Sequence, residues 1–438
     1  MTHYAHSRQI PVVATLDVFV AGGGLAGICA AVSAAQAGMK VLLVEQFADL
    51  GGAATISGVS GFCGHTAGVG RPFDQIIGRL ADAGLIDEYR PEQDGRAFES
   101  VHAAYVMMDY VLAQGVEVLL HTSVVDAVRD GDRIDPVIIH TSGGLGAVCP
   151  KIVVDATGDA DLVQAAGFPT ESGTDEDPES RLPMSLCFSM WDTREKQTPW
   201  LPEGCPRYAA ETVPMTSISR KAGGRIDVKM KVIRHSAVDG RGLSDAEIEA
   251  RRQMMGVIYF LQTEGYGGKR YDTYRLSSVA PHIGVREGRR IVGEARLTTD
   301  DVRSGRRWPD AVAVGTYHID YHWPDLLQRA GTGITDGAPT YHIPLRALIP
   351  KGARNVLVAG RCASGEQLAM SSFRVMATAE AMGHAAGLCA AMAAKAGLAP
   401  GEVDVPALQS ALVASGAVLD PDWHAVYQAS RRPQRPGW

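Results

Sequence analysis

The chain has 438 residues, of which 46% are hydrophobic and 21% are charged, and its formal net charge is −7. This length fits two or three domains, or one elaborated α/β domain with an inserted partner, and the composition is that of a soluble globular protein. The negative charge offers nucleic acid no electrostatic attraction, so we expect no nucleic-acid partner.

The seven cysteines are scattered and form no C-x-x-C pair. This disfavours zinc ribbons, iron–sulfur clusters and thioredoxin-type disulfides, and a reducing cytoplasm is the expected location. The N-terminal residues lack a basic segment followed by an apolar one, so no secretory signal is expected. The most apolar stretch, Val375 to Ala394, contains Glu380 and His384, which favours a buried helix over a membrane span.

Residues 16–50 predict a strand, a glycine turn, a helix and a second strand that ends in Glu45. Gly22, Gly24 and Gly27 have the spacing G-x-G-x-x-G, which permits a tight turn, a close approach to a pyrophosphate and close packing of helix on sheet. Glu45 is placed to bind the ribose hydroxyls of an adenosine and to disfavour a 2′-phosphate. The stretch therefore predicts an adenine dinucleotide site that is not for NADP.

The segment Gly51 to His65 consists mostly of small, uncharged residues, and we expect it to pass close under the cofactor. Helices follow over residues 71–115, including one from Phe98 to Gln114 with Gly115 as its stop. A strand over 116–121 and a hairpin-like alternation lead to about residue 148. The next buried strand ends in Asp155-Ala-Thr-Gly-Asp-Ala-Asp161, where Asp159 or Asp161 is expected to cap the following helix.

An acidic stretch broken by Pro178 indicates a boundary into an inserted domain. There we expect short strands at 186–191 and 225–231 and a helix over 244–263, which begins with the capping box Ser244-Asp-Ala-Glu247. The chain then returns with a strand and glycine turn at 355–361 and a long small-residue helix over 371–395, followed by a short amphipathic segment at 405–412 and a mobile tail, Arg431 to Trp438. The predicted division is a first part of the cofactor domain at 12–172, a substrate domain at 173–340, a return segment at 341–400 and a C-terminal helix and tail at 401–438.

Three segments together resemble the FAD-dependent oxidoreductase family of the glutathione-reductase-like superfamily, distantly similar to fumarate reductase flavoproteins. They are the Gly22–Gly27 fingerprint with Glu45, the Asp155-Ala-Thr-Gly-Asp159 motif, and the C-terminal run Asn355 to Ser364 with Ser371 to Thr378 and Gly383-His-Ala-Ala-Gly387. More particular marks are Arg286-Glu-Gly-Arg-Arg-Ile-Val-Gly-Glu294, Tyr317 to His322 and Ile343 to Pro350, and the resemblance covers residues 16–415. Where the family usually has Ser, this chain has Gly288, which leaves more room beside the flavin. The resemblance implies non-covalent FAD and redox chemistry on a small molecule.

The residues alone also favour FAD over NAD, because a single G-x-G-x-x-G is joined by two later strand-and-glycine turns that would grip a long cofactor at several points. The expected architecture is an α/β fold, a Rossmann-like FAD-binding domain with an inserted mixed α+β substrate domain. The long helix from Ser371 is expected to aim its N-terminus at the N1/O2 edge of the flavin. The residues that we expect to bind FAD are Gly22, Gly24, Leu25, Ala26, Gly27, Glu45, Gln46, Gly51, Gly52, Ala53, Val125, Ala156, Thr157, Gly158, Asp159, Gly360, Arg361, Ser371 and Ser372.

Two segments carry candidate catalytic residues. Arg286 either faces the flavin and grips a substrate carboxylate, or shares in ion pairing within the run to Arg290. In an extended strand His318, Asp320 and His322 lie on one face, which suits an acid/base group, with metal binding and a purely structural role as alternatives. A redox-active Cys63 would need a partner thiol, and Cys362 is expected to pack against the cofactor; no metal site is predicted.

The function that we infer is hydride transfer between a carbon of a small polar organic substrate and flavin N5. Two alternatives stay open: a flavin enzyme that modifies a macromolecule such as tRNA, and a flavin-binding redox-responsive protein without turnover. The sequence leaves the direction of the reaction, the electron acceptor or donor and homo-oligomerisation undetermined. No membrane partner is expected.

Overall fold

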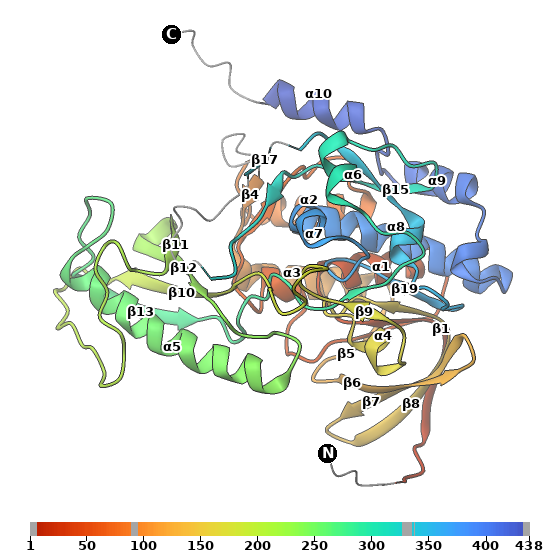
Figure 1. Ribbon diagram of the computed structural model, residues 1–438, viewed down its shortest axis with the longest axis horizontal. Helices are drawn as coiled ribbons and strands as arrows, with labels where there is room; N and C mark the ends of the chain where they lie inside the picture. The colour runs from red at the N-terminus through yellow and green to blue at the C-terminus, as the bar shows by residue number, and fades with distance from the viewer. Residues whose placement is uncertain (1–6, 89–94, 326–334, 337, 432–438) are drawn as a thin grey trace.

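The computed structural model describes residues 7–88, 95–325, 335–336 and 338–431 (Figure 1). Residues 1–6 of the N-terminal lead-in and residues 432–438 of the predicted mobile tail lie outside the described part of the chain.

A seven-stranded sheet organises the first part of the chain. Its order is β5-β2-β1-β8-β7-β6, and β19 also pairs with β8. The parallel part of the sheet consists of β1, β2, β5, β19 and the C-terminal half of β8. The antiparallel part is a meander of β6, β7 and the N-terminal half of β8. Continuous apolar runs such as Val41–Val44 suit strands that are covered on both faces. The strands are β1 (Val12–Ala21), β2 (Val41–Val44), β5 (Glu117–Leu119), β6 (Ser123–Asp130), β7 (Arg133–Thr141), β8 (Gly144–Asp155) and β19 (Val356–Val358).

Two helices rich in small residues cross on this sheet. α1 (Leu25–Gln36) joins β1 to β2 and completes the predicted βαβ unit, and α8 (Met376–Ala396) packs against α1. A Cβ atom on Gly383 would overlap the carbonyl oxygen of Ala26, so only glycine lets the two helices approach this closely. The prediction of a buried helix here is confirmed, and no helix in the described residues has the length and apolar character needed to cross a membrane.

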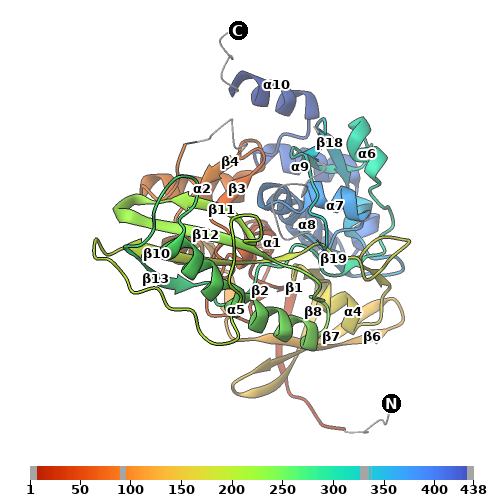
Figure 2. The same cartoon turned by 60° about the vertical axis from the view of Figure 1, so that its left-hand side comes forward.

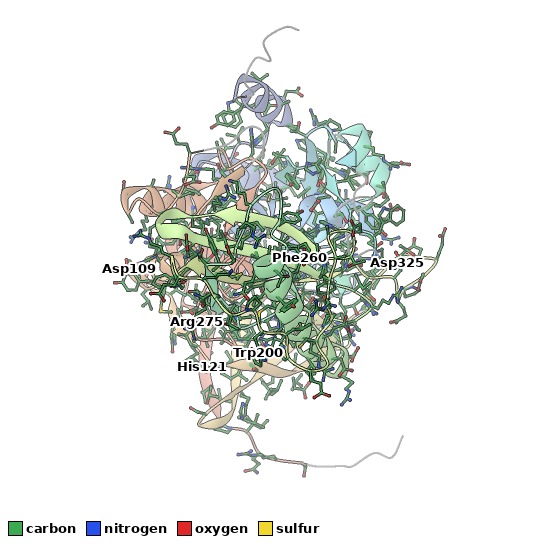
Figure 3. The ribbon with its side chains drawn as sticks, turned by 90° about the vertical axis from the view of Figure 1, so that its left-hand side faces the viewer. Asp109, His121, Trp200, Phe260, Arg275 and Asp325 are labelled. Atoms are coloured by element: carbon green, nitrogen blue, oxygen red, sulfur yellow. The ribbon has the colours of Figure 1, made fainter. Side chains whose placement is uncertain are left out.

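A second, antiparallel sheet lies beside the first and has the order β11-β12-β10-β13 (Figure 2). Helix α5 (Gly240–Thr263) covers one face of it, because alternate residues of β12 such as Val228 and Met230 are apolar and pack with the helix. Figure 3 views this side of the molecule, with Phe260 of α5 and Arg275 of β13 labelled. The strands are β10 (Met184–Asp192), β11 (Met215–Arg220), β12 (Arg225–Val232) and β13 (Tyr274–Val279).

Buried apolar side chains form two groups. The second sheet and α5 share one that runs from Met184 to Ile283. The other group packs around the first sheet; along the chain its members run up to Leu182 and continue from Ile291 onward. The predicted domain limits of 172/173 and 340/341 remain a prediction, and the change of core falls at 182–184 and 283–291.

The remaining elements surround these two sheets. Short strands are β3 (Gly61–Cys63), β4 (Gly95–Ala97), β9 (Thr170–Glu171), β14 (Arg290–Ile291), β15 (Ala311–Gly315), β16 (Ile319–Asp320), β17 (Thr335–Asp336) and β18 (Tyr341–Pro344). Helices are α2 (Arg71–Asp82), α3 (Ser100–Ala113), α4 (Asp161–Ala165), α6 (Thr299–Ser304), α7 (Gln367–Phe373), α9 (Val405–Ala414) and α10 (Pro421–Arg431), with 3₁₀ turns at Gly52–Ala54, Ala222–Gly224, Leu345–Leu348 and Pro400–Glu402.

Two helix starts differ from the prediction. α5 begins at Gly240, where the Asp239 carboxylate accepts from the amide of Gly242 at 2.6 Å; Ser244 lies inside the helix and donates to the Gly240 carbonyl, so it caps nothing. The single helix predicted from Ser371 is two helices, α7 and α8, which are separated because Val375 has extended backbone angles. The predicted stops at Gly115 and Gly397 are confirmed, and both residues have positive φ.

Candidate cofactor and active site

Four glycine turns from distant parts of the chain meet at the start of α1. Gly22 has φ +94°, and a Cβ there would lie 2.5 Å from the carbonyl oxygen of Ala156, so the first turn lies directly on the second motif. A Cβ on Gly52 would lie 2.9 Å from the Cα of Gly24, and one on Gly360 would lie 3.2 Å from the Cβ of Ala26. The sequence predicted that the fingerprint and the two later glycine turns contact one long cofactor, and the structure places these turns next to one another.

Glu45 ends β2 beside this cluster and is almost fully buried. One carboxylate oxygen accepts from the amide of Gly23 at 2.7 Å and the other from the amide of Phe47 at 3.0 Å. Burial raises the pKa of Glu45, and these amides partly oppose the rise. A carboxylate has about four acceptor positions, so two remain for the hydroxyl groups of a ribose.

Asp155 organises the Ala156-Thr157-Gly158 turn and the start of α4. One oxygen accepts from the amide and hydroxyl of Thr157, and the other accepts from the amides of Leu162 and Val163. Burial raises the pKa of Asp155 to about 6, against the pull of these hydrogen bonds. The prediction that Asp159 or Asp161 caps the helix was wrong, because the buried carboxylate one turn earlier takes both first-turn amides.

Asp159 instead faces Arg361, whose Nη2 donates to it at 2.8 Å while Nε donates to the Gly158 carbonyl. Burial raises the pKa of Asp159, and the charge of Arg361 opposes this. A Cβ on Gly288 would overlap the Asp159 carboxyl group. The room that glycine leaves at position 288 is therefore filled by Asp159.

The other residues expected at the cofactor are spread along this edge. Leu25, Ala26 and Gly27 form the first turn of α1, and Gln46 and Ala53 lie in the segments that follow β2. Gly51 donates its amide to the Gly23 carbonyl at 2.8 Å. Val125 lies at a bulge near the start of β6. Just before β6, the amide of Thr122 donates to the Glu45 carbonyl, which connects this strand to the end of β2.

Ser371 and Ser372 are not at a helix N-terminus, because they lie inside α7. The Ser371 hydroxyl donates to the Gln367 carbonyl at 2.9 Å. The Ser372 hydroxyl donates to the Tyr317 carbonyl at 2.6 Å and accepts from the Tyr341 hydroxyl at 2.8 Å. The expectation that the long helix begins at Ser371 is therefore wrong, because the long helix α8 begins at Met376. That a helix N-terminus points at the flavin stays a prediction, now for α8.

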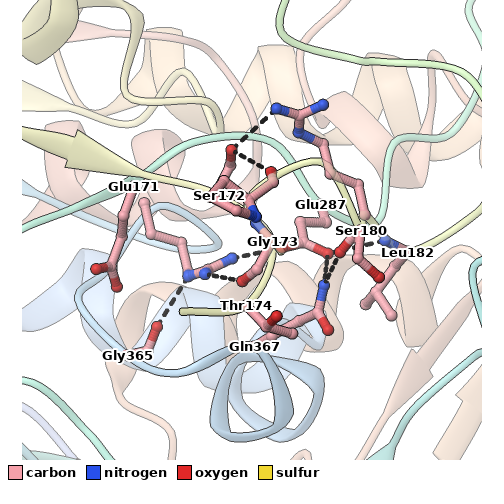
Figure 4. Close-up of polar contacts among 12 residues, drawn as sticks. Glu171, Ser172, Gly173, Thr174, Ser180, Leu182, Glu287, Gly365 and Gln367 are labelled. Atoms are coloured by element: carbon pink, nitrogen blue, oxygen red, sulfur yellow. Dashed lines mark hydrogen bonds and ion pairs between the residues drawn. The ribbon is translucent and has the colours of Figure 1, made fainter. Parts of the chain in front are cut away.

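The run Arg286 to Arg290 divides into different roles. Glu287 and Arg290 form a buried ion pair at 2.6 Å, and Glu287 also accepts from the amides of Gly173 and Leu182 (Figure 4). Arg289 pairs with Asp161 at 2.5 Å. Arg286 makes no ion pair among the described residues; its Nη1 donates to the Pro183 carbonyl at 2.7 Å, and burial together with the charge of Arg374 lowers its pKa to about 10.

Asp320 lies between an arginine and an imidazole. Arg374 Nη2 donates to its carboxylate at 3.0 Å, and His322 Nε2 lies 3.3 Å from the same oxygen. Because a carboxylate only accepts, the proton is on Nε2, and His322 Nδ1 is buried without a partner in the described part of the chain. Burial and the charge of Arg286 lower the pKa of His322 to about 4. Burial alone would raise the pKa of Asp320, but His322, Arg374 and Arg286 outweigh it and hold it well below its usual value.

The predicted trio is brought together only in part. The ring of His318 lies 4.0 Å from that of the neighbouring Tyr317, centre to centre and tilted by 36°, and no hydrogen bond between described residues joins it to Asp320 or His322. In the same described set, no three of the His, Cys, Asp and Glu side chains gather closely enough to hold a metal ion.

Sequence reasoning missed three charged residues whose charges act on Asp320 or Arg286. Arg374 carried a signal, since it is the single charged residue between Ser371 and Ala377. Lys229 and Lys231 of β12 carried none, because alternating polar residues in a strand predict a solvent-facing side. Burial and the charge of Arg286 lower the pKa of both lysines, that of Lys231 to about 8.

A cavity between residues 65–69, β15, the start of α8 and residues 417–424 is lined by none of these side chains.

The residues present fit a dinucleotide. Among the described residues no side chain caps α1, so its first amides and its partial positive charge are open to a pyrophosphate. Glu45 at the end of β2 and the glycine turns beside the start of α1 are the other features that a dinucleotide site needs. Fold and site together define an α/β protein that binds a dinucleotide cofactor at the carboxyl ends of parallel strands.

The chain belongs to the FAD dependent oxidoreductase family, whose family model matches residues 17–412. Its cofactor is therefore FAD, and it is an enzyme of the oxidoreductase class.

Curated and solved proteins give further similarities. Thiamine thiazole synthase from Methanococcus maripaludis is 30% identical over 155 residues, which is 33% of this chain, and the chain spans only 57% of that protein. A geranylgeranyl bacteriochlorophyll reductase-like protein from Thermoplasma acidophilum has a TM-score of 0.49 at 12% identity, covering 96% of this chain and 97% of its own. The p-nitrophenol 4-monooxygenase of Pseudomonas putida has a TM-score of 0.48 at 13% identity, covering 95% and 93%. With TM-scores below 0.5, these two structures carry no argument about the reaction.

Proposed function

We propose that this FAD-dependent oxidoreductase moves a hydride between a carbon of a small polar organic substrate and its cofactor, with His322 and Asp320 handling the accompanying proton. FAD supplies the hydride chemistry when it is bound. The observation that carries the proposal is the buried pair in which Asp320 accepts from His322 Nε2 and leaves Nδ1 without a partner among the described side chains.

The pair divides the work between orientation and proton transfer. Asp320 fixes the ring and its tautomer, since it accepts from Nε2. His322 Nδ1 then holds the free lone pair that can take a proton from the substrate, or return it in the reverse direction. Arg286 and Arg374 orient the substrate and restrict the positions it can take.

The test is flavin reduction under anaerobic conditions, with a metabolite panel scored first for bleaching of the flavin. With a bleaching substrate in hand, His322→Ala is expected to slow reduction by about 10²–10⁴-fold, the usual share of a general base, with FAD content unchanged. His140→Ala, at an exposed position on β7, is the matched control and should reduce at the wild-type rate. An unaltered rate in His322→Ala would remove this residue from the reaction.

The pH profile gives a second readout. A base must be deprotonated to act, and the pKa of His322 is lowered from 6.5 to about 4. We therefore expect kcat/KM to stay level from about pH 5 to 8, without the rise through pH 6.5 that an ordinary histidine base gives. Asp320→Asn should lower kcat/KM, and a profile that rises through pH 6.5 in the wild type would contradict this assignment.

A further inference from the structure

Asp320 contacts Arg374, and its charge acts on three further cationic side chains; we call Lys229, Lys231, Arg286 and Arg374 the cation cluster. Burial lowers the pKa of both lysines and of Arg286; the charge of Arg286 adds to the shift of the lysines, and the charge of Arg374 adds to that of Arg286. Two members come from the second sheet and two from segments that flank the first, so the cluster bridges the two parts of the fold.

Strand alternation explains why the lysines point inward. Val228, Met230 and Val232 of β12 pack under α5, so Lys229 and Lys231 face the opposite side of the sheet. Lys229 pairs in register with Cys187, and a Cβ added to Gly58 would lie 3.2 Å from the Cβ of Cys187. The segment around Gly58 therefore lies against this face, where Lys231 is fully buried and Lys229 is half-buried.

Two charges of the cluster, those of Lys229 and Arg286, have no carboxylate in contact with them among the described residues. Burial raises the pKa of Cys63, Cys187 and Tyr317, so all three are neutral near pH 7. Asp320 is the carboxylate that acts on the cluster, and Arg374 and His322 already share its Oδ2. Arg286 is buried and Lys229 is half-buried, and neither is paired with a carboxylate in the described part of the chain, although charges withdrawn from water are normally paired.

From this imbalance we infer that the site takes a small organic molecule with two anionic groups, either two carboxylates or one carboxylate and one phosphate, which we call a dianion after its two anionic groups. One charge lies against Arg286 and Arg374, and the other lies against Lys229. The inference rests on the proposed function, because it names the substrate class of that same site. It also explains how His322 becomes a better base: an anion offsets the charge of Arg286, which lowers the pKa of His322 in the free protein.

The experiment is calorimetric titration of the oxidised, FAD-loaded enzyme with a matched set of probes. Glutarate and succinate carry two carboxylates, 2-phosphoglycolate carries a carboxylate and a phosphate, and succinamate has the size of succinate with a single charge. We expect the dianions to bind at least about tenfold more tightly than succinamate, the equivalent of one charge-assisted hydrogen bond. The stronger of the two dianion types identifies the second charged group.

Lys229 variants test the assignment of the second charge. Lys229→Gln should remove the dianion preference, while Lys229→Arg should keep it; Lys395→Gln, at an exposed position of α8, is the control. Burial lowers the pKa of Lys229, and a bound dianion should raise it again, so binding should take up protons wherever the free lysine is partly deprotonated, seen as a dependence of the binding heat on the buffer over a pH series. Circular dichroism and FAD content check that each variant is folded.

Equal affinity of the wild type for succinate and succinamate, or an unchanged preference in a folded Lys229→Gln, would overturn the inference. Both readouts are equilibrium binding and need no turnover. If a dianion binds as expected while flavin reduction in His322→Ala proceeds at the normal rate, His322 is not the base but the dianion site is supported. The failure of one proposal can therefore be distinguished from the failure of the other.

Discussion

Glu380 lies near the start of α8, and none of its surface is exposed to solvent. Neither carboxyl oxygen has a hydrogen-bond partner among the described residues. Burial raises its pKa well above the usual value, and the nearby charge of Asp74 adds to the shift. The folded protein therefore carries a proton on Glu380 at pH values where the unfolded chain has lost it.

This proton makes stability depend on pH. Above the unfolded pKa of about 4.3 the native state binds more protons, so the free energy of unfolding falls as pH rises, by up to about 1.4 kcal/mol per pH unit. Glu380→Gln should remove that slope and make the protein more stable than the wild type at pH 8. Urea unfolding from pH 5 to 8 measures it, with exposed Glu176→Gln as the control. A slope that survives in Glu380→Gln would contradict the prediction.

Single residues also show where sequence reasoning ends. The fingerprint glycines and Glu45 could be predicted because each is dictated by local backbone geometry. The group that fills the space beside Gly288 could not be predicted, because it is the carboxyl group of Asp159, which is far away in the chain. Arg374 could have been found as a lone charge in an apolar run, but its contact with Asp320 depends on the fold.

At the scale of elements, the helix starts that were mispredicted have physical causes. Gly240 and Gly242 have low helix propensity and hide the start of α5, yet a Cβ on Gly242 would lie 2.7 Å from the Ser236 carbonyl oxygen, so glycine is needed there. Between α7 and α8 the break falls at Val375, and neither proline nor glycine marks it in the sequence. Tertiary contacts of Arg374 and Ser372 fix that break, and such contacts are invisible in a local pattern.

The crossing of α1 and α8 is a point where one added methyl group should be felt in the cofactor site. A Cβ on Gly383 overlaps the Ala26 carbonyl in the first turn of α1. Gly383→Ala is expected to destabilise the protein by about 1–3 kcal/mol through overpacking, and to weaken FAD binding because that turn is displaced. Thermal unfolding and a fluorescence titration with FAD measure the two effects.

Gly78 in α2 offers the control, since a Cβ there meets nothing within 4 Å. Gly78→Ala should stabilise the helix by up to about 1 kcal/mol and leave FAD affinity unchanged. If Gly383→Ala behaves like Gly78→Ala, the close contact of the two helices does not position the cofactor turn.

For the molecule as a whole, the sequence predicted the FAD-binding architecture because its motifs report local geometry. It did not predict the face of the second sheet for which we propose anion binding. Lys229 and Lys231 alternate with apolar residues as they would on a solvated strand, and the segment at Gly58 lies against their face at Cys187. Which polar face is covered is decided by how the two sheets meet.

The two parts of the fold are joined by the buried pair of Glu287 and Arg290. Arg290 also donates to the carbonyls of Gly173 and Gly365, and Gln367 donates to Glu287, so the pair fastens the segments that leave and re-enter the first core (Figure 4). Arg290→Met would leave the Glu287 carboxylate buried without its cation. We expect a loss of about 3–5 kcal/mol, and unfolding of the two cores at separate temperatures.

Arg296 supplies the comparison, because it pairs with Glu171 and Asp175 in the same region but is about one-third exposed. Arg296→Met should cost less than about 1 kcal/mol, as is usual for solvent-screened pairs. Circular dichroism and release of flavin fluorescence, followed together on heating, report the two cores. Arg290→Met losing no more stability than Arg296→Met would show that the junction is held by apolar packing. Coincident transitions in Arg290→Met would show that the pair is not what couples the two parts, since removing it should let the second sheet and α5 melt apart from the FAD-binding sheet.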